Sequence, residues 1–143
     1  MWRLNLWFFP LSLCLLALTI KDIERAFLQN RADLLSNLCW QEAAIQVSLP
    51  DPISFSDILT AAQTRVFFAR LFASYPTFEF LVESPLPAHP LGQTWIIRSR
   101  WSFLAKKNLS QHVLRVYFLL KMTTQEGKRD VGWKIIEIRA EKI

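Results

Sequence analysis

Glycine is scarce in this chain, and what the sequence lacks excludes several classes of protein. Three glycines among 143 residues are too few for the glycine-rich loops that cradle phosphate groups. With seven prolines and no internal repeat, the composition also excludes collagen-like, low-complexity and repeat architectures. The two histidines, His89 and His112, have no cysteine or acidic residue at ligand spacing. We therefore predict no metal site and no cofactor.

Cysteine is equally sparse, with Cys14 and Cys39 as the two thiols. Cys14 lies in an N-terminal segment that we expect to be outside the folded domain, and a single remaining cysteine cannot form a disulfide within its own domain. Cys39 stands beside Trp40 at the end of a helical pattern, where a buried small hydrophobic residue is the usual interpretation. A reactive thiol is the alternative.

The uncharged stretch Leu6–Ile20, which follows Arg3, is typical of a targeting or anchoring segment. It is short for a membrane-spanning helix, which needs about 17–25 residues, and Ala17–Thr19 is its best small-residue cleavage pattern. We predict a signal peptide or N-terminal membrane anchor over residues 1–20 and a single domain over residues 21–143. A buried helix is the third interpretation of the segment. The expected address is bacterial and exported, either periplasmic or secreted, with inner-membrane anchoring if the segment is retained.

Apolar residues make up 52% of the chain and charged residues 20%, which is sufficient for a packed core. Two runs rich in β-branched and aromatic residues, Leu114–Lys121 and Gly132–Glu141, predict a long antiparallel hairpin at the end of the chain. Apolar residues at helical spacing predict one helix over Lys21–Asn37. They predict a second helix that is capped by Ser54 or Ser56 and runs to about Ser74.

Apolar residues that alternate with polar ones predict strands at Ala43–Leu49, Thr77–Val82, Gln93–Ala105 and Gln111–Thr123. Three prolines make Pro85–Pro90 a predicted loop. In the last strand, Trp133 and Ile135 share a face with Ile138 and Ala140 only if the alternation slips by one residue. That slip predicts a β-bulge near Ile136-Glu137, and a bulge bends a sheet. We predict an α+β fold in which two helices pack in the concavity of a strongly bent antiparallel sheet.

Several stretches together carry a family resemblance: Ile23–Phe27, Ser54–Asp57, Val66–Phe68, Tyr75–Phe78, Leu114–Lys121 and Ile138–Lys142. Over about residues 22–142 the chain resembles the nuclear transport factor 2-like, or cystatin-like, cone. More narrowly, it resembles a bacterial family of unknown function that is exported behind a signal peptide. The chain departs from that family's pattern in its proline-rich loop and its tryptophans. The resemblance implies the cone fold, but the bacterial family has no established activity to transfer.

The superfamily includes isomerases, dehydratases and cyclases, which resemble one another in placing an acid/base pair inside the cavity. Such chemistry needs a carboxylate or imidazole that faces the substrate. The predicted inward faces are almost wholly apolar, and His112, at a strand end, is their one titratable residue. The leading interpretation is a non-catalytic binding or interaction module of the envelope. The alternative is a cavity enzyme of the isomerase or dehydratase type with a small apolar substrate.

Two surfaces are candidate binding sites. The cone mouth is predicted to offer an aromatic pocket to a small apolar ligand, and its residues are Trp95, Trp101, Trp133, Phe68, Phe72 and His112. The same aromatic residues are also typical of a packed core. The outer face of the sheet is predicted to be basic and to contact a partner through Arg98, Arg100, Arg115, Tyr117 and Lys121, with Lys134 and Arg139 beside them.

The charge distribution favours an anionic partner for the outer face. From Gln93 onward the chain has 11 basic and 4 acidic residues, whereas residues 21–92 have 5 basic and 8 acidic residues. An anionic partner in the envelope matches this excess and the predicted address, and a solvated basic sheet is the alternative. Nucleic acid is not expected, because an exported protein rarely meets it.

Apolar residues on the same face open the option of a homodimer through the sheet. Ile96, Val113 and Leu119 would leave an apolar area exposed there, and a two-fold interface would cover it. The arginines oppose this pairing, because like charges across an interface are penalised unless Glu137 or Glu141 neutralises them.

Overall fold

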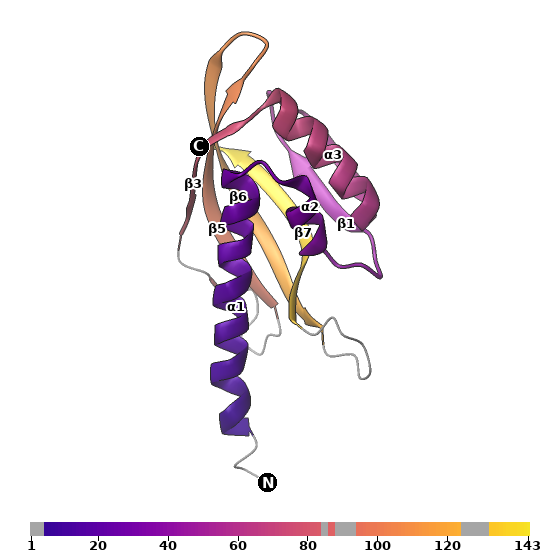
Figure 1. Cartoon of the computed structure of the whole chain (residues 1–143), viewed down its shortest axis with the longest axis vertical. Coiled ribbons are helices and arrows are strands. Elements are labelled where there is room, and N and C mark those ends of the chain that lie inside the picture. Colours follow the sequence, from indigo (N-terminus) through magenta and orange to yellow (C-terminus); the bar gives the residue numbers. More distant parts are fainter. Residues whose placement is uncertain (1–4, 84–85, 88–93, 124–131) are drawn as a thin grey trace.

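The computed structural model describes the backbone of residues 5–83, 86–87, 94–123 and 132–143. Helices pack against one side of a curled sheet (Figure 1), which confirms the predicted α+β cone. The helices are α1 (Asn5–Leu28), α2 (Ala32–Asn37) and α3 (Ala61–Ser74). The strands are β1 (Ile45–Leu49), β2 (Phe55–Leu59), β3 (Thr77–Val82), β4 (Leu86–Pro87), β5 (Thr94–Ala105), β6 (Ser110–Thr123) and β7 (Gly132–Lys142).

The strand order is β2-β1-β7-β6-β5-β3, and β4 pairs with β5 beyond the end of β3. The predicted terminal hairpin is confirmed, because β6 and β7 pair antiparallel along their length. One pair differs from the predicted antiparallel sheet, since β1 and β7 run parallel. A parallel pair needs a long connection, and the whole chain between β1 and β7 provides one.

The predicted bulge in the last strand is confirmed. Leu119 pairs with Glu137 and Leu120 with Ile135, so Ile136 is the extra residue. The slip turns Ile135 and Ile138 to the same side, where both are fully buried. A second register shift lies in β3, between Thr77 and Glu79, and leaves Phe78 as the extra residue. In the alternating pattern Phe78 shares a face with Phe80, but its side chain is 54% exposed whereas Phe80 is buried.

The prediction of one helix over residues 21–37 is wrong, because the chain turns between α1 and α2. Asn30 adopts a positive φ of 52°, a conformation that asparagine tolerates better than most residues. Its side-chain oxygen accepts a hydrogen bond from the backbone N–H of Thr77 at 2.9 Å. A contact with a residue 47 positions away fixes the turn, and local periodicity cannot reveal such a contact.

The predicted start of the next helix is also wrong. Residues 55–59 form strand β2, paired with β1, and α3 begins after Thr60 instead of after Ser54 or Ser56. Thr60 and Gln63 form a capping box. The Gln63 N–H donates to Thr60 Oγ1 at 3.2 Å, and the Thr60 N–H donates to Gln63 Oε1 at 2.9 Å. In the predicted loop at residues 85–90, Leu86–Pro87 form the short strand β4, and the remaining residues lie outside the described part of the chain.

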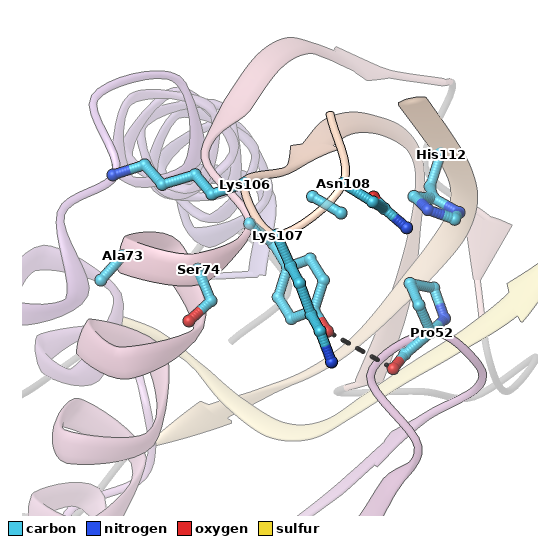
Figure 2. A pocket seen from close by; sticks show the side chains of 9 residues that line it. Pro52, Ala73, Ser74, Lys106, Lys107, Asn108 and His112 are labelled. Atoms are coloured by element: carbon cyan, nitrogen blue, oxygen red, sulfur yellow. Dashed lines mark hydrogen bonds between the residues drawn. The ribbon is translucent and has the colours of Figure 1, made fainter. Parts of the chain in front are cut away.

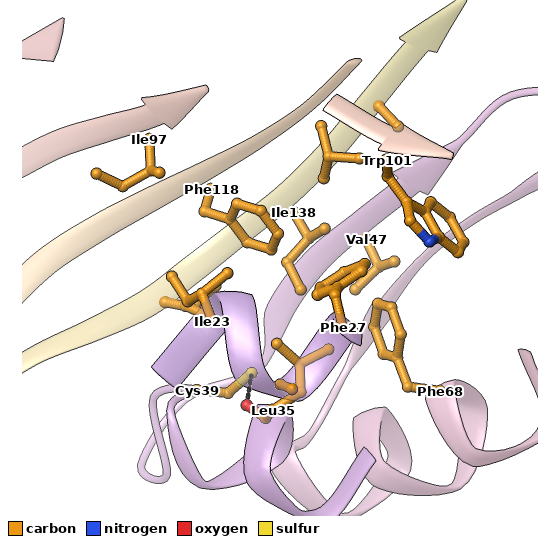
Figure 3. Packing of buried hydrophobic residues seen from close by; sticks show 14 of the residues in the cluster. Ile23, Phe27, Leu35, Cys39, Val47, Phe68, Ile97, Trp101, Phe118 and Ile138 are labelled. Atoms are coloured by element: carbon orange, nitrogen blue, oxygen red, sulfur yellow. Dashed lines mark hydrogen bonds between the residues drawn. The ribbon is translucent and has the colours of Figure 1, made fainter. Parts of the chain in front are cut away.

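The core lies between the helices and the concave face of the sheet, and aromatic rings fill its centre (Figure 3). The Phe27 ring, from α1, stacks on Phe80 with centroids 4.5 Å apart. It also meets four further rings edge-on: Phe68, Phe72, Trp101 and Phe118. One side chain therefore joins α1 to α3 and to three strands of the sheet.

Helix α1 continues through the predicted boundary between residues 20 and 21. Leu16 is 3% exposed and Thr19 is 8% exposed, and Leu16 belongs to the same hydrophobic cluster as the rest of the core. Figure 1 shows the N-terminal half of α1 running past the ends of the sheet strands. Within the described residues, no helix is both long and apolar enough to cross a membrane. The segment's role as a signal peptide or anchor stays a prediction.

Candidate functional site

The residues predicted to line the cone mouth differ in how deeply they are buried. Phe68, Phe72, Trp101 and Trp133 are buried in the core, and Trp95 is half-buried. The Trp101 indole N–H is satisfied internally, because it donates to Thr77 Oγ1 at 2.7 Å. Most of this set therefore stabilises the cone through packed aromatic area.

His112 does not share a site with Trp95. On β5 and β6, Trp95 pairs with Leu120 and Phe103 pairs with His112. Eight strand residues separate Trp95 from Phe103, which corresponds to about 27 Å. Trp133 pairs with Met122 and lies at the Trp95 end. The structure therefore divides the predicted set between two ends of the sheet.

His112 instead lines a pocket of about 440 Å³ at its own end of the sheet (Figure 2). We call it the end pocket. Its residues come from the loop after β1, the end of α3, the β5–β6 turn and the start of β6: Pro52, Ala73, Ser74, Tyr75, Ala105, Lys106, Lys107, Asn108 and His112. Sequence reasoning selected His112 alone among them, because the others come together only through the fold.

Contacts between aromatic rings fix the positions of Tyr75 and His112 in the end pocket. The His112 imidazole lies parallel to the Phe103 ring at 5.5 Å, and Phe103 meets the Tyr75 ring edge-on at 5.6 Å. Tyr75 is the C-cap of α3 and donates its N–H to the Leu71 carbonyl at 2.7 Å. The Tyr75 hydroxyl makes a long contact of 3.5 Å with the Pro52 carbonyl oxygen. Tyr75 and His112 are therefore positioned by the core.

The loop that brings Pro52 to the end pocket is held by Asp51. The Ser54 hydroxyl donates to the Asp51 carboxylate, and Lys142 Nζ lies 3.7 Å from the same group. The hydrogen bond from Ser54 and the charge of Lys142 lower the pKa of Asp51 below its ordinary value. This carboxylate is therefore already engaged beside the pocket and stays ionised at neutral pH.

The outer face of the sheet carries the predicted basic residues, and some of them are paired. Glu83 contacts Arg98, with Arg98 Nε 2.5 Å from Glu83 Oε2, and it lies 4.0 Å from Arg115. Glu141 lies 3.8 Å from Arg115 and accepts a hydrogen bond from the Tyr117 hydroxyl at 2.8 Å. The Nε atoms of both arginines lack a hydrogen bond of suitable geometry, so these contacts are ion pairs. Partly exposed pairs of this kind contribute little to stability.

Basic groups remain in excess on the outer face. Arg100 is exposed and sits directly opposite Arg115, and no carboxylate of the described residues lies within ion-pair distance of Arg100. Lys121 sits opposite Lys134. The Lys121 ammonium group lies 5.4 Å from the centre of the Trp40 ring, a distance at which a cation is attracted to the ring face. Like charges placed directly opposite each other are destabilising in a sheet.

The described residues form two further hollows, one on the outer face and one outside the predicted sites. A depression of about 160 Å³ on the outer face is lined by Ile96, Tyr117, Leu119, Glu137 and Arg139. A groove of about 420 Å³ between β2 and α3 is mostly apolar, and its lining includes Phe55, Leu59, Val66 and Phe67. Sequence reasoning missed this groove because it assigned the β2 residues to the start of a helix.

The described residues were compared with what metal binding and nucleophilic chemistry require. They contain no group of three or more histidine, cysteine or acidic side chains that could hold a metal ion. The side chains that are both buried and polar or charged in the described part are Thr19, Ser36, Thr64, Ser99 and Ser102. Burial raises the pKa of the Cys39 thiol to about 12, so it is protonated and a poor nucleophile at neutral pH.

Comparison with known proteins decides the fold. A DUF4783 family protein from Bacteroides uniformis aligns with 86% of this chain and 95% of its own, with a TM-score of 0.64 and 12% identity. The fold is the nuclear transport factor 2-like cone. An NTF2-like protein of unknown function in nutrient uptake from Rhodospirillum rubrum aligns with 89% of this chain and 97% of its own, with a TM-score of 0.62 and 12% identity.

A third similar structure, an uncharacterised protein with a cystatin-like fold from Caulobacter vibrioides, aligns with 92% of this chain and 89% of its own. The TM-score is 0.64 and the identity is 8%. No family model and no curated protein matches the sequence. At these identities the nuclear transport factor 2-like relatives share the fold with this chain, and its function has to be argued from its own residues.

Proposed function

We propose that this nuclear transport factor 2-like chain is a non-catalytic binding module that contacts an anionic partner through the outer face of its sheet. The observation that carries the proposal is the imbalance of charge on that face. Six cations, Arg98, Arg100, Arg115, Lys121, Lys134 and Arg139, share it with the four acids Glu79, Glu83, Glu137 and Glu141. An anionic partner relieves the repulsion among the cations and is steered towards the face over long distances.

The shape of the face supports the same proposal. The Arg139 guanidinium lies over the Tyr117 ring, 5.2 Å from its centre, beside the shallow depression that Ile96 and Leu119 help to line. Arginine and tyrosine are enriched at interfaces because they combine a flat contact area with polar groups. In the expected exported setting, the partner is an anionic component of the bacterial envelope.

The enzyme alternative finds less support in the described interior. An isomerase or dehydratase needs a carboxylate or imidazole facing bound substrate. No carboxylate or imidazole is buried in the described part of the chain, and Phe27, Trp101 and their neighbours fill the cone at its centre. A small apolar ligand at the cone mouth would need space that the same aromatic side chains occupy.

A direct test is binding to vesicles of an anionic phospholipid and to a soluble acidic polymer, each compared with a neutral counterpart. We expect binding to at least one anionic probe, and we expect added salt to weaken it because exposed charges are screened. Replacement of Arg100 and Lys121 by glutamate should reduce the affinity by about tenfold or more. The matched control is Arg65→Glu combined with Arg70→Glu, which makes the same two charge reversals on the exposed side of α3.

Equal losses in the control and in the face variant would show that net charge alone is responsible. That result, or the absence of binding to every anionic probe, contradicts the proposal. Binding to the neutral counterparts as tight as binding to the anionic probes likewise contradicts it.

A homodimer through the outer face is the second mode of association that the same residues permit. Glu83 and Glu141 already pair with arginines of their own chain, which reduces the repulsion that two apposed faces would suffer. Leu81, whose partner in the sheet is Arg100, is 52% exposed and adds apolar area to the face. Sedimentation at low and high salt tests this mode. Dimers that strengthen with salt support it, and a monomer at every salt concentration excludes it.

A further inference from the structure

The end pocket lies apart from the outer face, and its polar groups are mostly hydrogen-bond donors. Tyr75 supplies a hydroxyl, Lys107 an ammonium group, Asn108 an amide and His112 an imidazole, and none of the described residues that line the pocket is acidic. We propose that the end pocket binds a small anion through a carboxylate or phosphate group. This site is separate from the outer face and does not depend on the function proposed for that face.

The orientation of the Asn108 amide follows from its hydrogen bonds. Its oxygen accepts the Ser110 N–H at 3.0 Å and the Ser110 hydroxyl at 2.6 Å. A backbone N–H can only donate, so the atom that receives it must be the amide oxygen. The Asn108 NH₂ group therefore points the other way, and Figure 2 shows its nitrogen turned towards the space between Lys107 and His112.

The same chain of bonds fixes the tautomer of His112. Ser110 has one hydroxyl proton, which it donates to Asn108, so its contact with His112 Nε2 at 2.8 Å requires that His112 donates. This leaves Nδ1 as the nitrogen available to a ligand, and in the neutral ring Nδ1 is an acceptor. A protonated ligand oxygen can donate to Nδ1, while the anionic oxygens face the Lys107 ammonium group and the Asn108 NH₂ group.

The charges around the end pocket agree with an anionic ligand. Lys107 lines the end pocket, whereas in Figure 2 the Lys106 side chain leads away from His112. The negative end of α3 is partly neutralised, because the Leu71 carbonyl accepts the Tyr75 N–H and the Ser74 carbonyl accepts the Lys106 N–H. The carboxylate next to Pro52 in sequence is Asp51, which is held by Ser54 and Lys142.

The volume of the end pocket limits the size of the ligand that it can bind. A volume of about 440 Å³ falls within the range of pockets that hold small molecules. The apolar part of the wall comes from Pro52, Ala73, Ala105 and the Tyr75 ring. A ligand with one oxyanion group and a short carbon body matches this combination. The oxyanion chemistry is shared by organic acids and by phosphate esters.

The test is a titration of the full chain with acetate and with inorganic phosphate, followed by the backbone amide resonances in NMR spectra. We expect saturable shifts at Lys107, Asn108 and His112. The probe that binds more tightly distinguishes a carboxylate ligand from a phosphate ligand. Shifts confined to the outer face, or no saturable shift with either anion, overturn the proposal.

Two variants separate the roles of the donors. Asn108→Asp keeps the acceptor that holds Ser110 but removes the NH₂ donor and adds a negative charge, so we expect a loss of at least about tenfold in affinity. Lys107→Gln should weaken binding because it removes the ammonium charge. Arg65→Gln, which removes one positive charge on the exposed side of α3, is the matched control and should leave anion binding unchanged. Unchanged affinity in both Asn108→Asp and Lys107→Gln, with the fold intact, overturns the proposal.

Discussion

Cys39 shows how burial sets the chemistry of a single side chain. Its side chain is fully buried and its Sγ–H donates to the Leu35 carbonyl at 3.4 Å. Desolvation raises its pKa to about 12, and the charge of Lys134 lowers it slightly against that main effect. In the unfolded chain the thiol ionises at its ordinary value near 9.0. The contribution of Cys39 to stability is therefore fully present below about pH 9 and is lost as the pH rises towards 12.

This linkage predicts a difference between the native chain and a Cys39→Ala variant. Between pH 9 and pH 11 the free energy of unfolding of the native chain should fall more steeply, by up to about 1.4 kcal/mol per pH unit. Urea unfolding at several pH values measures the two slopes. The variant removes the thiol and keeps the other groups that titrate in this range. Parallel slopes would contradict the burial of Cys39 in the folded state.

Residue-level inspection of the sequence selected one residue that lines the end pocket and missed the others. His112 was selected because it was the one titratable residue on a predicted inward face, and it does line a pocket. Its partners Lys107 and Asn108 lie in the neighbouring turn, where charged and amide side chains are ordinary and carry no signal. Pro52 and Tyr75 reach the pocket only because β1, α3 and the β5–β6 turn meet at one end of the sheet.

At the scale of elements, the start of α3 depends on its capping box. Thr60→Ala removes the acceptor for the Gln63 N–H, and loss of such a cap costs about 1 kcal/mol of stability. Ser74→Ala, at the other end of the same helix, is the control, because the Ser74 contact is made by its backbone carbonyl. We expect the midpoint of urea unfolding to fall in Thr60→Ala and to stay within error in Ser74→Ala. Equal midpoints in both variants would argue against the cap.

The elements differ in how well the sequence predicts them, and the physical reason is their length. In β5, β6 and β7 the alternation of apolar and polar residues continues over 11 to 14 residues, so even a one-residue slip at Ile136 is visible. Strand β2 has five residues, Phe55–Leu59, and so short an apolar pattern fits a helix equally well. Its pairing with β1 decides the outcome. The turn at Asn30 likewise depends on a contact with β3, far along the chain.

At the scale of the whole molecule, Phe27 joins the helical layer to the sheet. Its ring touches aromatic side chains from α3, β3, β5 and β6 and is 1% exposed. Phe27→Ala should therefore destabilise the domain by about 3–5 kcal/mol. Phe78→Ala removes the same atoms at a side chain that is 54% exposed and should cost within about 0.5 kcal/mol. Denaturant unfolding compares the two. Similar losses would contradict the central position of the Phe27 ring.

The continuity of α1 has a consequence for the wide end of the cone. Leu16 lies two helical turns before Ile23, about 10 Å along the axis. It belongs to the same hydrophobic cluster as Trp133, and Leu15, Ile20, Trp95 and Met122 pack against that cluster. A protein that loses its first 20 residues loses the buried Leu16 side chain and would expose the apolar core surface that Leu16 covers. Processing of the N-terminus would therefore change how much of the core meets solvent.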